Sequence, residues 1–468
     1  MTWGGSQVRI LYRAQSVRLV KYMIILGIET SCDETALALI ETRETILSKD
    51  GNDGTLEYRI ISSLVHSQAA LHSAYGGVFP NLAKREHSKN LIPLLKKLLD
   101  ESGVYESIVT EKSVKTKILA DEMFDTKMTE LTKLLAEKNS DLLASITNTN
   151  IENNPTCKNN ADFLKNIPDI DLIAVTEGPG LEPALWVGIN FAIILSKLWN
   201  IPIKAVNHME GHIVGSLLQS DKPYGTWQNL KTLPLPAVSL LISGGHTELV
   251  KIDHCGSNGG NEPQDTSDEN YHYSMLGQTK DDAVGEAFDK VARLLVLPYP
   301  GGPHISKLAY EAREKNIASP VKLPRPMIQS GDCNFSFSGL KTAVLYALKK
   351  MPHQTTSENT VNDTEIQQDF RTGLAREFED AVADVLENKL NRAISEHDAK
   401  AIIVGGGVSA NHLLRERFNK IATSHNIPLF LPDQHVSGDN ALMIALVAAM
   451  NNTPTRHILR ANGTKSLV

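Results

Sequence analysis

The heptapeptide LISGGHT at residues 241–247 joins two runs that have the composition of β-strands. Residues 237–242 read AVSLLI, and residues 248–252 read ELVKI. Apolar and β-branched residues on both sides of a Gly-Gly pair predict a hairpin with a tight tip. The tip offers small side chains and open backbone N–H groups, which can bind a phosphate closely, although the same residues also form ordinary turns.

A second unit of this kind lies roughly 210 residues earlier in the chain. Residues 23–30 (MIILGIET) and 36–40 (ALALI) are predicted strands, and SCDET at residues 31–35 is the polar tip between them. Two such units suggest two related lobes, each offering a turn to one cleft. This is the plan of the actin-like ATPases, which include sugar kinases and Hsp70-like proteins. We therefore predict an α/β actin-like fold with a metal and nucleotide cleft between the lobes.

Length and composition agree with two lobes of a globular protein. The chain has 468 residues, of which 41% are hydrophobic and 22% are charged. Its net charge of −7 argues against coating nucleic acid by bulk electrostatics, but leaves room for a local basic patch or for a partner that helps to deliver such a substrate. The four cysteines are scattered without CxxC spacing, which indicates a reducing compartment and no cysteine zinc site.

Four segments follow from these patterns. Residues 1–22 hold four basic and no acidic residues, so they form either a mitochondrial transit peptide or a disordered extension before the strand that opens at Met23. Residues 23–232 are lobe I, with a Lys/Glu/Asn-rich insertion at about 101–166 that we expect to be a solvated helical hairpin and linker. Residues 233–435 are lobe II, and residues 436–468 are a C-terminal helix returning to lobe I plus a tail. No stretch is long and apolar enough to span a bilayer.

The motif NHMEGH at residues 207–212 follows a predicted strand and begins a helix. His208 and His212 are four residues apart and share a helix face, an arrangement that often holds a divalent metal. The motif is not that of the HExxH proteases, because Met209 occupies the glutamate position and Glu210 lies about 200° around the helix from His208. Asp439 precedes an apolar helix at 441–450 and is either a helix cap or a metal ligand.

Several further turns could contact a nucleotide. The sequence TEGPG at 176–180 leads into a helix N-terminus, which can bind an anion but is more often just a turn. Asp289, in a predicted helix at 281–295, is either a ribose ligand or a solvated acid. We also expect a rigid YPGGP turn at 299–303, a helix at 338 onward with Ser338 as its N-cap, a loop at 253–273, and a GGGVSAN turn at 405–411.

Taken together, eight motifs resemble the TsaD/Kae-type tRNA threonylcarbamoyltransferases, and the HMEGH form resembles their bacterial and organellar branch. The resemblance extends from Met23 to about Met450, and the N-terminal extension, the 101–166 insertion and the 253–273 loop depart from it. The motifs are GIETSCDET (27–35), NHMEGH (207–212), LISGGHTEL (241–249), DDAVGEAFDK (281–290), YPGG (299–302), NFSFSGLKTA (334–343), GGGVSAN (405–411) and GDNALMIA (438–445).

This resemblance implies a set of roles. His208, His212 and Asp439 would hold one divalent ion, Fe or Zn before Mg, that joins the two lobes. Substrate contacts would come from Leu241, Ile242, Ser243, Gly244, Gly245, Asp289, Gly302 and Asn411. The reaction would move a threonylcarbamoyl group from threonylcarbamoyl-AMP to N6 of adenosine 37, next to the anticodon, in tRNAs that read codons starting with A. Asp33 and Glu34 are candidates to orient or deprotonate the amine, and Cys32 needs no catalytic role.

The same resemblance implies the partners. They are tRNA, threonylcarbamoyl-AMP and, in bacterial relatives, a paralogous inactive actin-fold protein and a small P-loop ATPase, whereas mitochondrial relatives act without the last two. We expect a cytoplasmic protein without membrane contact, or a mitochondrial one if residues 1–22 are a transit peptide. Two alternatives stay open: an ATPase or kinase of the same fold, which would phosphorylate a substrate with ATP alone, and a non-catalytic actin-like scaffold, which would not need the metal residues.

Overall fold

The chain forms two compact units in the computed structural model, which describes residues 7–13, 16–47, 56–104, 117–119, 121–147, 162–219, 222–254, 271–350 and 360–468. Unit 1 comprises Met1–Gln68, Phe79–Lys231 and Asp439–Leu467. Unit 2 comprises Ala69–Val78 and Thr232–Gly438, together with Val468. The short segment Ala69–Val78, which contains helix α1 (Ala69–Ser73), therefore groups with unit 2, although it lies far from the rest of that unit in the sequence.

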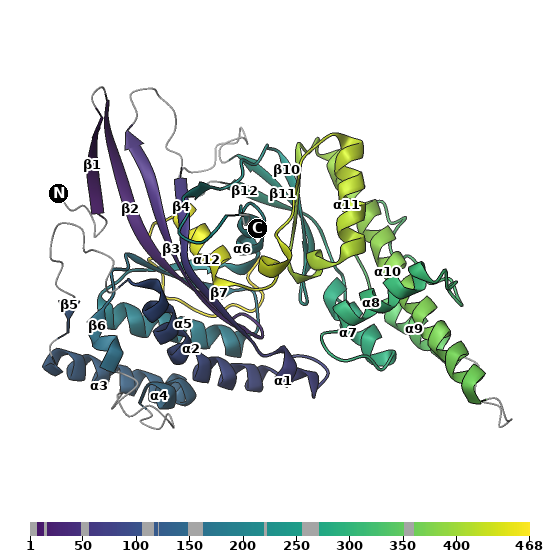
Figure 1. Cartoon of the computed structure of the whole chain (residues 1–468), viewed down its shortest axis with the longest axis horizontal. Helices are drawn as coiled ribbons and strands as arrows, with labels where there is room; N and C mark the ends of the chain where they lie inside the picture. The colour runs from purple at the N-terminus through teal and green to yellow at the C-terminus, as the bar shows by residue number, and fades with distance from the viewer. Residues whose placement is uncertain are drawn as a thin grey trace. The chain divides into compact units, whose positions relative to one another are not determined.

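Unit 1 is built on a mixed sheet whose strand order is β8-β7-β2-β3-β4-β9 (Figure 1). The pairs β2–β3 and β3–β4 are antiparallel, whereas β2–β7 and β7–β8 are parallel. Its strands are β2 (Ser16–Glu29), β3 (Glu34–Leu47), β4 (Leu56–Ser67), β7 (Leu172–Gly178), β8 (Ile203–Asn207) and β9 (Gln228–Asn229).

The first strand of this sheet begins seven residues before the expected start at Met23. Strand β2 starts at Ser16, and β1 (Gln7–Arg13) pairs antiparallel with its first half, from Gln7 opposite Tyr22 to Arg13 opposite Ser16. Residues 8–12 (VRILY) and 17–21 (VRLVK) are mostly β-branched, aromatic and other apolar residues, a composition that favours strands. Residues 1–6 and 14–15, to which the transit-peptide prediction also applies, lie outside the described residues.

Opposite faces of β2 carry different helices. Leu26 and Ile28 belong to a buried cluster with residues of α2 (Pro80–Ser102) and α5 (Glu182–Trp199). Gly27, which points the other way because side chains alternate along a strand, packs against α12 (Ala441–Met450), where a Cβ would lie 2.3 Å from the Ala441 carbonyl oxygen. A glycine at this position lets α12 lie directly on the sheet.

The insertion of unit 1 is helical but not merely solvated. It contributes α3 (Asp121–Lys138) and α4 (Ser140–Thr147), and the two-residue strands β5 (Lys117–Ile118) and β6 (Asn166–Ile167) pair with each other. Leu131, Leu135, Leu142 and Ile146 are fully buried in the same core as α2 and α5. The apolar spacing of α3 therefore outweighs its Lys/Glu-rich composition, and α4 contains neither lysine nor glutamate. The Asn-rich stretch at residues 148–161 lies outside the described residues.

The sheet of unit 2 has the order β12-β11-β10-β13-β14. Strands β10–β11 and β11–β12 are antiparallel, and β10–β13 and β13–β14 are parallel. Strand β12 occupies the end of the segment that we expected to be a loop, and residues 255–270 of that segment are not described. The strands are β10 (Ala237–Ile242), β11 (Thr247–His254), β12 (Tyr271–Gln278), β13 (Ala401–Gly405) and β14 (Leu429–Phe430).

The two sheets repeat one topology. In unit 1 the series β4-β3-β2-β7-β8 contains two antiparallel pairs followed by two parallel pairs, and β12-β11-β10-β13-β14 of unit 2 has the same sequence of pairings. The β2–β3 turn and the β10–β11 turn therefore occupy equivalent places. This duplication confirms the α/β actin-like fold that the two hairpins predicted.

Five long helices complete unit 2. Phe288 and Phe378 meet edge to face in its core with ring centres 5.1 Å apart, and Val284 and Val291 are buried as the predicted helix stripe requires. The helices are α7 (Val284–Leu294), α8 (Gly301–Glu314), α9 (Ser338–Lys349), α10 (Thr360–Glu396) and α11 (His412–His425).

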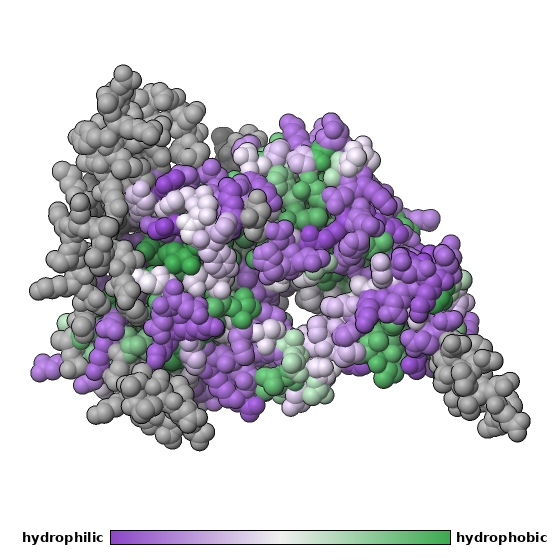
Figure 2. All heavy atoms as spheres, in the orientation of Figure 1, coloured by the Kyte–Doolittle hydropathy of each residue, from purple (hydrophilic) through white to green (hydrophobic). Residues whose placement is uncertain are grey.

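The surface is largely polar on the side shown in Figure 2, where hydrophilic residues predominate and hydrophobic ones form separate patches. In the part of the chain that the structure describes, no helix has both the length and the apolar character needed to cross a membrane.

Candidate active site

The two histidines of NHMEGH begin α6 (His208–Gly215), immediately after β8. Asn207 caps this helix, because its side-chain oxygen accepts the Met209 N–H at 2.9 Å. Asp439 lies just before α12, but Asn440 is the cap of that helix and accepts the Met443 N–H at 3.1 Å. The cap alternative for Asp439 is therefore wrong, and its carboxylate faces the two histidines instead.

His208, His212 and Asp439 place their ligand atoms within 4.8 Å of one another. One Asp439 oxygen lies 3.4 Å from Nε2 of His208 and 3.2 Å from Nε2 of His212. Among the described residues, His212 Nε2 is buried without a hydrogen-bond partner. Two imidazole nitrogens and a carboxylate that converge in this way fit a divalent metal. All three residues belong to unit 1. The resemblance had implied instead that the ion joins the two lobes.

Glu29, at the end of β2, orients the first histidine. It is fully buried, and one of its oxygens lies 3.1 Å from Nδ1 of His208. The same carboxylate accepts the Ser31 N–H at 2.5 Å and the Thr176 hydroxyl at 2.5 Å. A hydrogen bond from Nδ1–H to a carboxylate directs the lone pair of Nε2 toward the metal position. The sequence did not identify Glu29, although an acid at the end of the apolar strand MIILGIE is the signal that could have done so.

Buried charge shapes the ionisation of these groups. Burial lowers the pKa of His208, but Asp439 and Glu29 outweigh it and hold that pKa well above its ordinary value. Burial also raises the pKa of Asp439, but His208 and His212 outweigh it and hold that pKa well below its ordinary value. The site thus favours positive charge beside its carboxylates, as a metal position does.

The hairpin tip between β2 and β3 carries the two predicted catalytic carboxyls. Burial, followed by the charges of Asp33 and Asp439, raises the pKa of Glu34 to about 9, so Glu34 carries a proton at neutral pH. The Ser67 hydroxyl donates to it at 3.2 Å. Glu34 can therefore donate a hydrogen bond, which leaves Asp33 as the candidate proton acceptor of the pair. Burial and Asp33 raise the pKa of the Cys32 thiol, which keeps it protonated and a poor nucleophile.

His87 of α2 makes hydrogen bonds to residues of this hairpin tip. Its Nε2 lies 3.0 Å from the Cys32 carbonyl oxygen, and its Nδ1 lies 2.8 Å from the Thr35 hydroxyl and 3.2 Å from Nε2 of Gln68. With Nε2 as donor and Nδ1 as acceptor, all three contacts are satisfied. These contacts give His87 a structural role beneath the hairpin.

The glycine turn at the end of β7 is occupied by the chain itself. Gly180 N–H donates to the Gly463 carbonyl at 3.2 Å, and Leu181 N–H donates to the Ser31 carbonyl at 2.8 Å. A Cβ at Gly178 would lie 2.0 Å from the Asn462 carbonyl oxygen. These N–H groups therefore bond to the C-terminal tail and the first hairpin. The TEGPG sequence forms an ordinary turn and not an anion site.

The hairpin of unit 2 leaves its glycines open. Gly244 and Gly245 are exposed, and no atom lies within 4 Å of where a Cβ would be placed on either residue. The turn closes through the Ser243 N–H to the His246 carbonyl at 2.9 Å and the His246 N–H to the Ser243 hydroxyl at 3.0 Å. Leu241 and Ile242 are fully buried strand residues, so only their backbone could touch a ligand.

Two glycines from the motifs that carry Asp289 and Asn411 contact the same turn within unit 2. A Cβ at Gly406 would lie 2.3 Å from the Ile242 carbonyl oxygen, and the Gly285 N–H donates to the Ser243 carbonyl at 3.2 Å. Asp289 accepts the Gly301 N–H at 2.7 Å, which ties α7 to the start of α8, and the next residue, Gly302, is open.

The side-chain amide of Asn411 makes hydrogen bonds within the protein. Its oxygen caps α11 by accepting the Leu414 N–H at 3.1 Å, and its nitrogen donates to Ser306 and Glu379, both at 2.8 Å. A contact from Asn411 to a ligand remains a prediction.

Asp281 organises the NFSFSG motif, a role that the sequence missed. It precedes α7, where we expected the first helical turn, and it accepts the Phe337 N–H at 2.8 Å and the hydroxyls of Ser336 and Ser338, both at 2.6 Å. These donors hold the pKa of Asp281 below its usual value against the opposing effect of burial. The prediction of Ser338 as N-cap is wrong, because Phe337 holds that position and Ser338 is the first helical residue.

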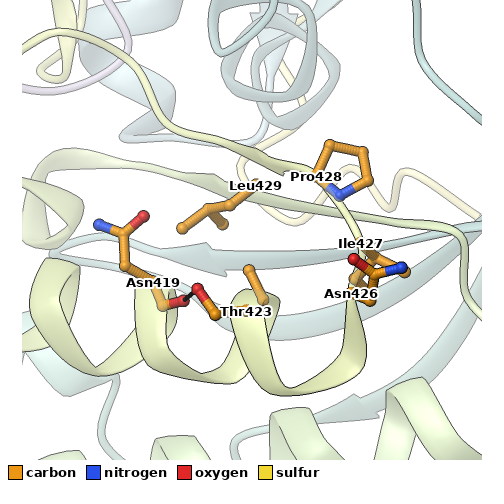
Figure 3. A pocket seen from close by; sticks show the side chains of 7 residues that line it. Asn419, Thr423, Asn426, Ile427, Pro428 and Leu429 are labelled. Atoms are coloured by element: carbon orange, nitrogen blue, oxygen red, sulfur yellow. Dashed lines mark hydrogen bonds between the residues drawn. The ribbon is translucent and has the colours of Figure 1, made fainter.

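A hollow of about 470 Å³ lies elsewhere in unit 2, where α11 faces the edge strand β14 (Figure 3). The Thr423 hydroxyl, one of its polar groups, is spent on the Asn419 carbonyl at 2.8 Å. The residues that line the hollow carry no charge and include none of the predicted site residues. They are Asn419, Ala422, Thr423, Asn426, Ile427, Pro428 and Leu429.

Comparison with known proteins identifies the family. The sequence model described as TsaD, tRNA N6-adenosine threonylcarbamoyltransferase, matches residues 59–110 and 160–446. The chain is 36% identical over 428 residues to the tRNA N6-adenosine threonylcarbamoyltransferase of Burkholderia ambifaria, covering 92% of each chain. It is 35% identical to the protein of that name from Ralstonia pickettii, covering 92% of this chain and 91% of that one.

Among solved structures, component A of the (R)-2-hydroxyglutaryl-CoA dehydratase of Acidaminococcus fermentans aligns with 91% of this chain and 98% of its own, at 10% identity and a TM-score of 0.38. The match to the TsaD model skips residues 111–159, which fall inside the insertion. The family model and the relatives agree over most of the chain, and the chain belongs to the TsaD family of tRNA N6-adenosine threonylcarbamoyltransferases.

Proposed function

We propose that this transferase moves the threonylcarbamoyl group of threonylcarbamoyl-AMP to N6 of adenosine 37 in tRNAs that read codons starting with A. The product is N6-threonylcarbamoyladenosine. Membership of the family supports the reaction class. The observation that carries the proposal is the convergence of His208, His212 and Asp439 in the unit that also holds the Asp33–Glu34 hairpin.

The histidines and Asp439 would hold one divalent metal, with iron or zinc ahead of magnesium because two imidazoles favour the softer ions. When bound, such an ion supplies positive charge that stabilises developing negative charge on an acyl or phosphoryl oxygen. Glu29 holds the His208 ring with Nε2 directed toward the ion, and Ser31, bonded to the same carboxylate, couples that ring to the hairpin tip.

Asp33 and Glu34 would divide the work on the attacking amine. The exocyclic N6 loses a proton when it bonds to the carbamoyl carbon, and AMP leaves with the electron pair of the broken C–O bond. Asp33 is our candidate to accept the proton. Glu34, protonated at neutral pH, is suited to donate a hydrogen bond to the substrate.

The open turn of unit 2 would bind the adenylate. Backbone N–H groups of the exposed Gly244 and Gly245 suit a phosphate. The Ser243 backbone, Asp289, Gly302 and Asn411 would bind the nucleoside. Leu241 and Ile242 would contribute only their backbone.

The partners and compartment belong to the same proposal. We expect the chain to act in the cytoplasm with a paralogous inactive actin-fold protein and a small P-loop ATPase if it is bacterial. If residues 1–22 direct it to the mitochondrion, we expect it to act without these two proteins.

Reconstitution tests the proposal. The protein is incubated with tRNA, threonine, bicarbonate, ATP and an adenylate-forming enzyme, with and without the two partners, and the digested tRNA is analysed by mass spectrometry. We expect threonylcarbamoyladenosine with wild-type protein and its loss in the His208→Ala/His212→Ala variant, while the exposed-site control His412→Ala keeps activity. If no modified adenosine forms in any combination, the proposal fails.

A further inference from the structure

The last seventeen residues of unit 1, residues 451–467, form a tail that the proposed chemistry does not use. The tail begins after α12 and lies beyond residue 446, where the match to the family model ends. From residue 440 to the end, the sequence contains three Lys or Arg residues and no Asp or Glu, in a chain whose net charge is −7. The tail is therefore a basic segment, free of acidic residues, in a chain whose net charge is negative.

Backbone hydrogen bonds fix the path of the tail on unit 1. Thr455 lies along the edge strand β8, where its N–H donates to the Ile203 carbonyl at 2.9 Å and its hydroxyl accepts the Ala205 N–H at 2.8 Å. Farther on, Asn462 N–H donates to the Glu177 carbonyl at 3.0 Å. The tail thus runs from the open edge of the sheet to the carboxyl ends of β7 and β8.

The tail ends beside the metal histidines. Asn207, the residue before His208, donates its side-chain N–H to the Ser466 carbonyl at 3.0 Å. Gly180 donates to the Gly463 carbonyl, and the neighbouring Leu181 is bonded to Ser31 of the first hairpin. A ligand lying along the tail would therefore be guided toward the end of the sheet that carries the candidate site.

One buried acid holds the tail and leaves two arginines outside. The Glu177 carboxylate accepts from Lys465 at 2.5 Å, from His457 at 3.0 Å and from the Arg460 backbone N–H at 3.3 Å. The guanidinium groups of Arg456 and Arg460 are exposed, and neither has a hydrogen bond or ion pair to any residue that the structure describes. A fixed backbone that presents two unneutralised guanidiniums is suited to binding phosphates.

We propose that Arg456 and Arg460 bind the phosphate backbone of the tRNA substrate and that the tail forms part of the tRNA-binding surface of unit 1. This inference rests on the proposed function. A polyanionic ligand explains why both exposed side chains, Arg456 and Arg460, are positively charged. It also explains why Glu177 pairs with the Lys465 side chain and not with either guanidinium. It also explains how an acidic chain attracts an acidic substrate, because phosphate contacts need only a local basic surface.

The test compares tRNA binding by Arg456→Ala/Arg460→Ala with that of the wild type over a range of salt concentrations, using fluorescent tRNA and the full chain. We expect about a tenfold loss of affinity near 100 mM salt, and a salt slope smaller by about 1–2, as expected for two lost phosphate contacts. The matched control, Lys315→Ala/Lys420→Ala, removes two exposed charges from unit 2 and should bind like the wild type. Arg456→Lys/Arg460→Lys should retain most of the affinity.

The outcomes separate this inference from the proposed function. If the wild type modifies tRNA and the double alanine variant binds and modifies it equally well, the tail inference is overturned and the function stands. The tail inference is also overturned if the lysine control loses as much affinity, or if the variant loses binding to vesicles of anionic lipid but not to tRNA. If the wild type neither binds nor modifies tRNA, the proposed function fails first.

Discussion

At the residue scale, Glu29 connects three parts of the candidate site through one buried carboxylate. It faces His208, Thr176 and the Ser31 N–H at once. One Glu29 oxygen faces both His208 and Thr176, and the other accepts the Ser31 N–H. In Glu29→Gln, the amide NH₂ group replaces one of these oxygens. It then either deprives the His208 ring of its acceptor or changes its tautomer, or it opposes the Ser31 N–H and disturbs the carboxylate position that orients the ring. We expect a 10–100-fold loss of metal affinity, the usual effect of removing such a partner.

Equilibrium dialysis against a competing chelator, followed by elemental analysis, measures this affinity without any assay of activity. The matched control is Glu182→Gln, an exposed acid in the first turn of α5, which should bind metal like the wild type. Equal metal affinity in Glu29→Gln and the wild type would refute the orienting role of Glu29.

Asp171, just before β7, gives the fold a pH dependence. Burial, together with the charges of Asp169 and Glu41, raises its pKa to about 6, although it accepts the Ile24 N–H at 2.8 Å. Because the folded state holds this proton more tightly than the unfolded state, the contribution of Asp171 to stability falls as the pH rises from about 4 to about 6. Asp171→Asn keeps an acceptor for Ile24 and removes the charge.

We therefore expect Asp171→Asn to match the wild type near pH 4 and to be more stable by about 1–2 kcal/mol at pH 7. Urea unfolding at the two pH values measures the difference, with the exposed Asp100→Asn on α2 as control. A variant that gains stability at pH 4 but not at pH 7 would contradict the assigned cause.

At this scale, the sequence identifies residues whose spacing along the chain indicates their chemistry. The four-residue separation of His208 and His212 identified a pair that the structure brings together with Asp439. It did not find Glu29, because the partners of Glu29 lie 147 and 179 residues away along the chain. Such contacts depend on which strands become neighbours in the sheet. A local sequence pattern does not predict the strand order.

At the element scale, the loop before the NFSFSG motif is held by a lysine of α10. The side chain of Lys389 is fully buried and donates to the Ser330 hydroxyl and the Asp332 carbonyl, both at 2.7 Å. Lys389→Met keeps the volume but removes the charged donor that links α10 to Ser330 and Asp332. We expect a loss of about 2 kcal/mol in the free energy of unfolding.

Chemical denaturation of Lys389→Met, with the exposed Lys400→Met as control, measures this loss. If both variants unfold at the wild-type urea concentration, the lysine does not support the loop.

Element boundaries show where local pattern is sufficient and where packing decides. The hairpin at 243–246 lies where the Gly-Gly pair predicted it, and a helix begins at His208, as the NHMEGH motif predicted. The strand at 271–278 was missed, because Gly, Asn and Asp dominate the residues before it. The insertion helices were predicted, but their burial was not, since Leu131 and Ile146 contact a core assembled from distant segments.

At the scale of the whole molecule, the duplication could be inferred from two strand–turn–strand motifs, because both sheets repeat the same order of pairings. The sequence also predicted that the C-terminal helix returns to the first lobe, and Asp439–Leu467 groups with unit 1. The membership of Ala69–Val78 could not be inferred, because this segment groups with unit 2 although its neighbours in the sequence belong to unit 1. Its local composition does not indicate which core it packs against.

Two separate cores and a metal site confined to one of them predict an asymmetric response to metal. Each unit has its own buried cluster, and all three candidate ligands belong to unit 1.

In calorimetry of the metal-free protein we expect two unfolding components. A metal at about 100 times its Kd adds about 2.7 kcal/mol to the unit that binds it, which raises one transition by about 5–10 °C for a unit of this size. The other transition should stay in place, and His208→Ala/His212→Ala should abolish the shift. Equal shifts of both transitions, or a shift that survives in the double variant, would show that the metal binds elsewhere or that the two units unfold as one.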